Sequence, residues 1–335
     1  MKYYSSKTIF FISTFAIFFT ACKNENSSNN QEILIPQENI KVRIPKFDGK
    51  AAKEFIAKQV SFGTRVTGSK GHQECKNWLT SQFKSLGAEV IEQNFTTTTF
   101  NNVKLNATNI IARFNPNVQE RIILSAHYDT RPFAEKDPNP MRQSDPILGA
   151  DDAGSGVGVL LEIAKLLQRN PIPMGVDIVL FDAEDYGQPE NSKFPFMQDS
   201  WCLGSQYWSA NLHKPNYYAR YGILLDMVGG KDATFRHEKI SASYGYNVLQ
   251  KVWRKANKLG YGNYFIFEDA NEILDDHYYV NTITGIPTID IIEYDPTTKT
   301  NFNKHWHTHK DDMDNIDKNT LNAVGQTLLE VIYNE

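Results

Sequence analysis

The sequence predicts a mixed α/β fold in which a mainly parallel central sheet carries helices on both faces, within a single domain. Short apolar strands alternate with amphipathic helices along most of the chain, which is typical of parallel sheets covered by helices. A run of strands before that alternation indicates an antiparallel edge on the sheet. The length of 335 residues is large for one domain but suits a single α/β domain.

The first half of the predicted fold starts near Pro45. Apolar residues at helical spacing predict two helices, and runs rich in β-branched and aromatic residues then predict four strands. We expect the helices at residues 51–60 and 73–86, and the strands at 88–95, 98–105, 109–114 and 121–126.

The second half alternates between the two kinds of element. We expect helices at 154–168, 205–212, 247–259 and 321–333, and strands at 176–181, 222–225, 264–267 and 288–292. Because sites on such sheets form beyond the carboxyl ends of the strands, polar clusters at those ends are the first candidates for a functional site.

The N-terminal residues predict export. Lys2 and Lys7 flank the start of an apolar run at 8–20, which has the length of a signal peptide and is too short to span a bilayer. Small residues directly before Cys22 resemble a bacterial lipobox, and the alternative is an ordinary secretory signal. We therefore expect a periplasmic lipoprotein that contacts a bacterial membrane only through a lipid on Cys22. The expected parts are a signal peptide at 1–21, a polar tether at 22–44 and a catalytic domain at 45–335.

Charge and cysteine content limit the classes of partner and cross-link. Removing residues 1–21 deletes two lysines and no acid, so the net charge changes from −4 to −6. An acidic chain of this kind argues against nucleic-acid binding. Cys75 and Cys202 remain after Cys22, and in an oxidising compartment they have one possible pairing. These two cysteines can form a disulfide or stay as free thiols, and the sequence is compatible with both.

Six polar clusters follow predicted strands or begin predicted helices. Alone, each has an ordinary explanation: Asp152 could cap the helix that starts at residue 154, and Glu184 with Asp185 could lie in a solvated loop. Together they offer histidine nitrogens and carboxylate oxygens, which are the ligands of a catalytic zinc. The clusters are at 127–129, 149–154, 184–185, 226, 275–277 and 306–308.

These clusters, in this order, resemble the motifs of the M28 family of zinc aminopeptidases and glutaminyl-peptide cyclotransferases. The resemblance runs from about Pro45 to Glu335 and includes an entry loop at 65–72. The motifs that carry it are Gly-Ala-Asp-Asp-Ala-Gly at 149–154, Glu184-Asp185, Asp226 after two leucines, Asp276-His277, and His307-Thr308 with Asp311 beyond.

The resemblance implies roles for individual residues. One zinc would be held by Asp152, Asp185 and His307, and Glu184 would be the general acid/base. In the two-zinc aminopeptidases of this family, residues matching His127 and Asp226 join Asp152 around a second zinc. This chain has the matching residue at both positions. The metal ligands alone therefore do not distinguish a peptidase from a cyclotransferase.

Three features favour the cyclotransferase. Asp275 stands where the aminopeptidases have a small hydroxyl residue, and an acid beside Glu184 and Asp226 would share a proton with them. Trp306 and Phe302 match aromatic residues of the family's glutamine pocket, although Trp306 could instead be a core anchor. The stretch at 198–205 also resembles a cyclotransferase motif.

Two departures separate the chain from the animal cyclotransferases. The loop at 187–196 lacks their tryptophan, and Asp185 replaces a glutamate. Both fit the bacterial branch. The resemblance thus implies an acyltransferase that converts the N-terminal Gln of peptides to pyroglutamate and releases ammonia, with one Zn²⁺ per chain. Glu184, Asp275 and Asp226 would be catalytic. The alternative is an aminopeptidase with two Zn²⁺.

Overall fold

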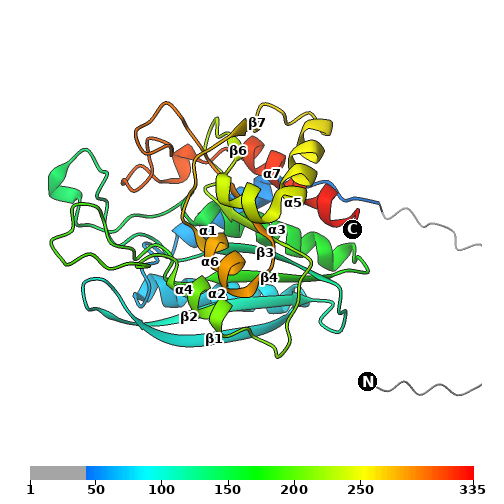
Figure 1. The fold of residues 1–335 in the computed structure, drawn as a ribbon, viewed down its shortest axis with the longest axis horizontal. Helices are drawn as coiled ribbons and strands as arrows, with labels where there is room; N and C mark the ends of the chain where they lie inside the picture. Colours follow the sequence, from blue (N-terminus) through cyan, green and yellow to red (C-terminus); the bar gives the residue numbers. More distant parts are fainter. Residues whose placement is uncertain (1–42) are drawn as a thin grey trace, which may run out of the picture. The chain divides into compact units, whose positions relative to one another are not determined.

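A six-stranded mixed sheet forms the centre of the fold in this computed structural model (Figure 1). Its strand order is β1-β2-β4-β3-β5-β8. Strands β3, β4, β5 and β8 are parallel, whereas β2 pairs antiparallel with both β1 and β4. The predicted fold class and its antiparallel edge are confirmed. The strands are β1 (Glu89–Thr98), β2 (Lys104–Phe114), β3 (Arg121–His127), β4 (Gly175–Phe181), β5 (Gly222–Asp226) and β8 (Thr288–Ile292).

The structure describes residues 43–335. The predicted signal peptide, the predicted lipidation site at Cys22 and all but the last two residues of the predicted tether at 22–44 lie outside this range. No helix between residues 43 and 335 is long and apolar enough to cross a bilayer.

The hairpin between β1 and β2 corrects one prediction. A separate strand was expected at 98–105, but Thr99 begins a turn that ends at Val103. The Thr99 hydroxyl contacts the Asn101 side chain and accepts from the Val103 amide, and Asn102 adopts a left-handed backbone with φ of 62°. This local hydrogen bonding opposes an extended conformation, so the run of threonines supplies one long strand and a turn.

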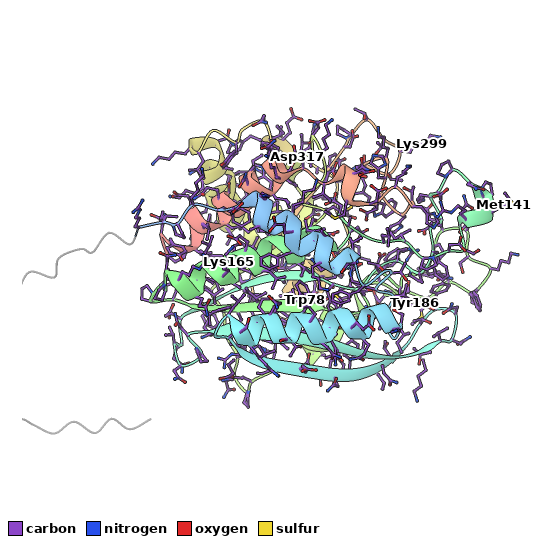
Figure 2. The ribbon with its side chains drawn as sticks, turned by 180° about the vertical axis from the view of Figure 1, so that it is seen from behind. Trp78, Met141, Lys165, Tyr186, Lys299 and Asp317 are labelled. Carbon is purple, nitrogen blue, oxygen red and sulfur yellow. The ribbon has the colours of Figure 1, made fainter. Side chains whose placement is uncertain are left out.

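Helices cover both faces of the sheet, but unequally. One face packs against five helices, of which α1 and α2 lie in front when the molecule is seen from behind (Figure 2). The other face packs against α4 and the π-helical turn η2 through Trp208 and Val280. The helices are α1 (Gly49–Val60), α2 (Lys70–Ser85), α3 (Gly154–Arg169), α4 (Leu203–Ala210), α5 (Lys239–Lys258), α6 (Asp276–Tyr279), η2 (Val280–Thr284) and α7 (Lys318–Ile332).

Close packing of α3 places its N-terminal turn at the carboxyl edge of the sheet. A Cβ at Gly156 would lie 2.4 Å from the Leu225 carbonyl oxygen, and one at Gly158 would lie 2.6 Å from Cγ1 of Ile56. Only glycine permits this approach to β5 and α1. Ala153 is the N-cap and makes no side-chain capping bond. Asp152 is therefore not the helix cap, and its carboxylate is directed to the site instead.

Several smaller elements go beyond the prediction. A second, two-stranded parallel sheet joins β6 (Phe235–His237) to β7 (Phe265–Asp269). Helix α5 starts eight residues before the predicted residue 247, because Glu238 caps it through the amides of Ile240 and Ser241. The short helix α6 and the π-helical turn after it were not predicted.

Both remaining cysteines are free and buried. Cys75 belongs to α2 and lies in the larger core. Cys202 precedes α4, and its thiol contacts Glu184. Of the two alternatives that the sequence left open, residues 43–335 therefore show free thiols.

Candidate active site

Polar side chains from three neighbouring strands meet at the carboxyl edge of the sheet. His127 ends β3, Glu184 and Asp185 follow β4, and Asp226 ends β5. Glu184, Asp185 and Asp226 line a cavity of about 310 Å³, and Asp152, from the turn before α3, also lines it. The predicted site therefore forms where the strand order and the direction of the parallel strands require it.

Asp152, Asp185 and His307 form one group that fits a metal ion. Their ligand atoms all lie within 4.8 Å of one another, and His307 Nε2 is 3.3 Å from Asp185 Oδ1. Both Asp185 oxygens are buried without a hydrogen-bond partner, which is costly unless a cation binds them. Burial raises the pKa of Asp185 well above its ordinary value, and the Asp152 charge adds to the shift. Two carboxylates and one imidazole are ligands that Zn²⁺ accepts.

Glu135 orients His307 from the side away from this group. His307 Nδ1 lies 2.8 Å from Glu135 Oε1, and the Arg131 guanidinium contacts the same carboxylate at 2.9 Å. Burial opposes ionisation of Glu135, but the contacts with His307 and Arg131 prevail and lower its pKa to about 2. Such a carboxylate fixes the imidazole so that Nε2 faces the metal position. This role could not be predicted from the sequence, because Glu135 lies in a long loop without periodicity.

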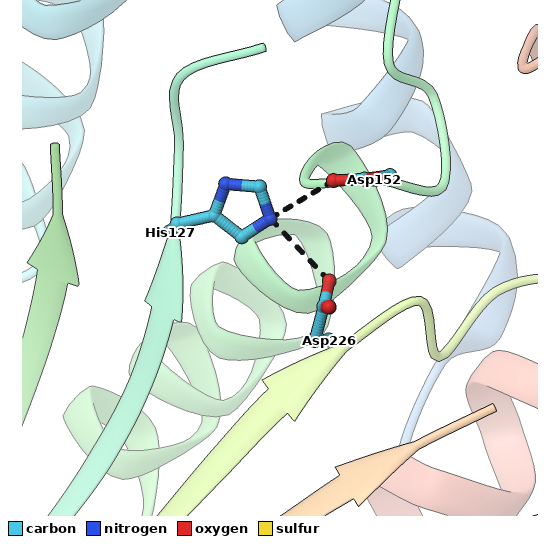
Figure 3. A group of neighbouring side chains, drawn as sticks. All are labelled: His127, Asp152 and Asp226. Carbon is cyan, nitrogen blue, oxygen red and sulfur yellow. Dashed lines mark hydrogen bonds and ion pairs between the residues drawn. The ribbon is translucent and has the colours of Figure 1, made fainter. Parts of the chain in front are cut away.

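His127, Asp152 and Asp226 form a second group that shares Asp152 with the first (Figure 3). His127 Nε2 lies 3.0 Å from Asp152 Oδ1 and 3.3 Å from Asp226 Oδ1. Burial opposes protonation of His127, yet the surrounding carboxylates raise its pKa well above the ordinary value. In this arrangement His127 thus contacts both carboxylates directly.

Glu184 is the centre of a third group, with Cys202 and Asp275. The Cys202 thiol donates to Glu184 Oε1 at 3.3 Å, and the ligand atoms of the three residues lie within 4.8 Å of one another. Burial raises the pKa of Glu184 well above its ordinary value, and the charges of Asp185 and Asp275 add to the shift. The structure therefore places Asp275 beside Glu184, as the sequence predicted. The contact with Cys202 was not predicted.

Two buried aspartates hold the turns that carry the metal-binding candidates. The Asp129 carboxylate accepts from the backbone amides of Glu184 and Asp185, both at 3.1 Å. The Asp311 carboxylate accepts from the amides of residues 151 and 152, at 2.7 and 3.1 Å. We call this arrangement the paired amide clamp. Asp129 and Asp311 lie within the recognised motifs, but the sequence did not reveal this contact.

The entry loop is anchored by a buried arginine. The Arg65 guanidinium donates to the carbonyl oxygens of Tyr128, Leu148 and Gly149, at 3.2, 2.8 and 2.7 Å. It therefore ties the end of β3 to the segment that leads into Asp152. This motif residue supports the site and does not line the cavity.

Aromatic side chains wall the cavity. Phe302 and Trp306 both line it, with ring centroids 4.8 Å apart. Trp306 also stacks on His307, with the centroids 3.7 Å apart. Trp306 is partly exposed to the cavity, so it is not a core anchor. Trp201, which the sequence analysis did not single out, stacks on His307 at 6.0 Å and completes the wall.

Known proteins resemble this chain over most of its length. The model of peptidase family M28 matches residues 109–332. A Zn-dependent exopeptidase structure from Parabacteroides distasonis is 49% identical, with a TM-score of 0.86, and the match covers 88% of this chain and 100% of that one. The glutaminyl cyclase structure of Tannerella forsythia is 48% identical, with a TM-score of 0.85 and coverages of 87% and 100%.

A curated relative gives a more distant match. The glutaminyl-peptide cyclotransferase of Bothrops jararaca is 25% identical over 249 residues, which are 66% of this chain and 63% of that protein. The chain thus spans less than two thirds of this relative's length. The family model, by contrast, matches well over half of the present chain. The chain belongs to peptidase family M28.

Proposed function

We propose that this protein is a zinc-dependent glutaminyl-peptide cyclotransferase, which converts an N-terminal glutamine of peptides to pyroglutamate. The observation that carries the proposal is the Asp275 carboxyl group beside Glu184, in a cavity whose wall includes Phe302 and Trp306. A carboxyl group there can hold the α-amine of a substrate, and aromatic rings suit the flat side-chain amide. The glutaminyl cyclase of Tannerella forsythia supports the proposal.

Asp152, Asp185 and His307 would hold the zinc ion. When bound there, zinc supplies a Lewis acid for the oxygen of the glutamine side-chain amide. The buried, unpartnered oxygens of Asp185 support this assignment.

Glu184 carries the proton transfers in the proposed reaction. The substrate α-amine forms a bond to its own side-chain amide carbon, and the bond from that carbon to the amide nitrogen breaks. Glu184 accepts a proton from the attacking amine and donates one to the leaving nitrogen, which departs as ammonia. No water is consumed. Asp275 and Asp226 hold the amine beside Glu184, and the gain comes from orienting two groups of one molecule.

The test compares two peptides that differ only at the first residue. Purified zinc-loaded enzyme is given a peptide that begins with Gln and one that begins with Leu, and products are followed by mass. We expect loss of ammonia from the first peptide and no change in the second. Glu184→Gln should lower the cyclisation rate by about 10²- to 10⁴-fold while zinc stays bound. An exposed control, Glu54→Gln, should keep the wild-type rate. Near-normal turnover by Glu184→Gln would rule out the assigned base.

The group of His127, Asp152 and Asp226 favours a second candidate, an aminopeptidase with two zinc ions. In that enzyme Glu184 would act on a water molecule. Metal analysis of the active protein separates the two candidates. One zinc per chain with ammonia release supports the cyclotransferase, whereas two zinc ions with release of free leucine would establish the aminopeptidase.

We also propose that the protein is exported and carries a lipid on Cys22, which would hold it on a bacterial membrane in the periplasm. The proposal rests on the lysines, the apolar run and the small residues that precede Cys22. Cells that express the chain should incorporate labelled fatty acid into it, and Cys22→Ser should abolish the label and release the protein from the membrane fraction. An unlabelled wild-type protein would exclude the anchor.

A further inference from the structure

We infer that a second, apolar pocket beside the active-site cavity binds the side chain of the residue that follows the N-terminal glutamine. The inference rests on the proposed function, because it takes the glutamine to occupy the active-site cavity. The pocket has a volume of about 380 Å³ and is formed by residues between 188 and 201 together with Leu274.

Large apolar side chains stay exposed around this pocket. Phe194 is 45% exposed, Phe196 is 87% exposed and Leu274 is 47% exposed. All three line the pocket. Scattered exposed apolar residues are common on protein surfaces, but several that converge on one hollow indicate a binding site. The lining therefore suits an aromatic or large aliphatic side chain.

The pocket shares a wall with the active-site cavity. Trp201 and Leu274 line both hollows. The Trp201 ring is held in place, because it stacks on His307 and the Arg131 guanidinium lies 4.3 Å from its centroid. An extended peptide advances about 3.3–3.6 Å per residue and directs successive side chains to opposite sides. The second residue of a peptide can thus cross this wall while the first stays in the cavity.

Hydrogen bonds within the loop hold the shape of the pocket. The Gln188 side-chain nitrogen donates to the carbonyl oxygens of Phe194 and Pro195, at 3.2 and 3.0 Å. Its side-chain oxygen accepts from the Met197 amide at 2.7 Å. The Gln188 backbone amide donates to the Ser200 hydroxyl at 3.0 Å. A pocket held in this way loses little conformational freedom on binding, which favours affinity.

Two acidic residues in the lining affect which substrate side chains the pocket can bind. Glu190 and Asp199 both border the pocket. The Asp199 carboxylate accepts from the Tyr279 hydroxyl at 2.9 Å, which fixes its position. Glu190 pairs with Lys136 at 3.4 Å, so the Asp199 carboxylate supplies the negative charge that disfavours an acidic side chain in the substrate. We therefore expect kcat/KM to be highest for a large apolar residue at the second position, lower for glycine and lowest for glutamate.

Steady-state kinetics of the zinc-loaded enzyme test the assignment. The substrates are the amidated peptides Gln-Phe-Gly, Gln-Gly-Phe, Gln-Gly-Gly and Gln-Glu-Gly. We expect kcat/KM for Gln-Phe-Gly to exceed that for Gln-Gly-Gly by about tenfold, which is the usual discrimination by an apolar pocket. Phe196→Ala should lower this ratio by about threefold or more. Its side chain is almost fully exposed, so folding should not suffer. The matched control is Tyr246→Ala, an exposed aromatic residue on α5 that should keep the wild-type ratio.

Several outcomes would contradict the assignment of the pocket. The pocket assignment is wrong if the wild-type ratio of kcat/KM is near one, or if phenylalanine is preferred only at the third position. In either case, cyclisation of Gln-Gly-Gly would still support the proposed function. An unchanged ratio in the double variant Phe194→Ala/Phe196→Ala also overturns the pocket assignment. If no peptide is cyclised, the proposed function fails and the pocket assignment fails with it.

Discussion

The contact between His307 and Glu135 shows how one residue of the site depends on a neighbour outside the recognised motifs. His307 Nδ1 faces the Glu135 carboxylate at 2.8 Å, and Arg131 holds that carboxylate in turn. The carboxylate keeps the imidazole in one orientation and makes Nε2 a stronger ligand. The strength of metal binding should therefore respond to a residue that does not touch the metal.

Glu135→Gln should raise the zinc dissociation constant about 10- to 100-fold, because the amide keeps the size of the side chain and removes its charge. Competition with a chromophoric chelator measures the constant. The control is Asp145→Asn, an exposed acid in the same loop. A dissociation constant equal to that of the wild type would show that Glu135 does not support the ligand.

At the scale of elements, the connection from α4 to β5 carries a partly buried titratable group, His213. The Trp208 indole donates to His213 Nδ1 at 3.2 Å, and the His213 ring packs on Tyr217 with centroids 4.4 Å apart. Burial lowers the pKa of His213 to about 4. This histidine is therefore neutral in the folded protein at pH values where it is partly charged in the unfolded chain.

The sign of the pH dependence follows from that difference. An unfolded histidine has a pKa of about 6.5, so the unfolded chain binds more protons than the folded protein between pH 6.5 and pH 4. Stability from His213 is complete above that window and is lost as the pH falls through it. Between pH 7 and pH 5 the free energy of unfolding should fall by about 2 kcal/mol less in His213→Gln than in the wild type. The glutamine keeps a hydrogen-bond acceptor for Trp208. Urea unfolding of both proteins at the two pH values measures this difference, and equal losses would contradict the assignment.

How far the sequence could predict the elements depended on their periodicity. The strands β3, β4, β5 and β8 were placed to within a few residues because they are short, largely apolar runs that are buried throughout. The helices α3 and α7 were placed equally well because their apolar residues recur at helical spacing. The hairpin at 99–103 and the start of α5 were misplaced, since side-chain bonds of Thr99 and Glu238 decide them. The loops that carry Glu135 and Trp201 have no period, so their contacts with His307 could not be predicted.

At the scale of the whole molecule, the site concentrates negative charge. Asp152, Glu184, Asp185, Asp226 and Asp275 all line one cavity. Burial of a carboxylate without a hydrogen-bond partner, such as Asp185, is unfavourable, and a bound cation relieves it. The folded protein should therefore be more stable with its metal than without it.

Removal of zinc by a chelator should lower the melting temperature by about 10 °C, because a ligand at a thousandfold excess over its Kd adds about 4 kcal/mol. Calorimetry before and after chelation measures the change, and added zinc should reverse it. A reductant should leave the melting temperature unchanged, because Cys75 and Cys202 are free. A melting temperature that does not respond to chelation would show that the metal does not support the fold.

The paired amide clamp has a consequence for how such sites diverge. Asp129 and Asp311 accept hydrogen bonds from backbone amides. The conformation of each turn therefore does not depend on the side chains of the metal-binding candidates. The side chain at position 185 could then lengthen or shorten while its Cα stays in place. The family resemblance implies a glutamate at this position in the animal cyclotransferases, and such a turn would accommodate either carboxylate. The two turns can thus keep their backbone conformation when a side chain that they carry is replaced.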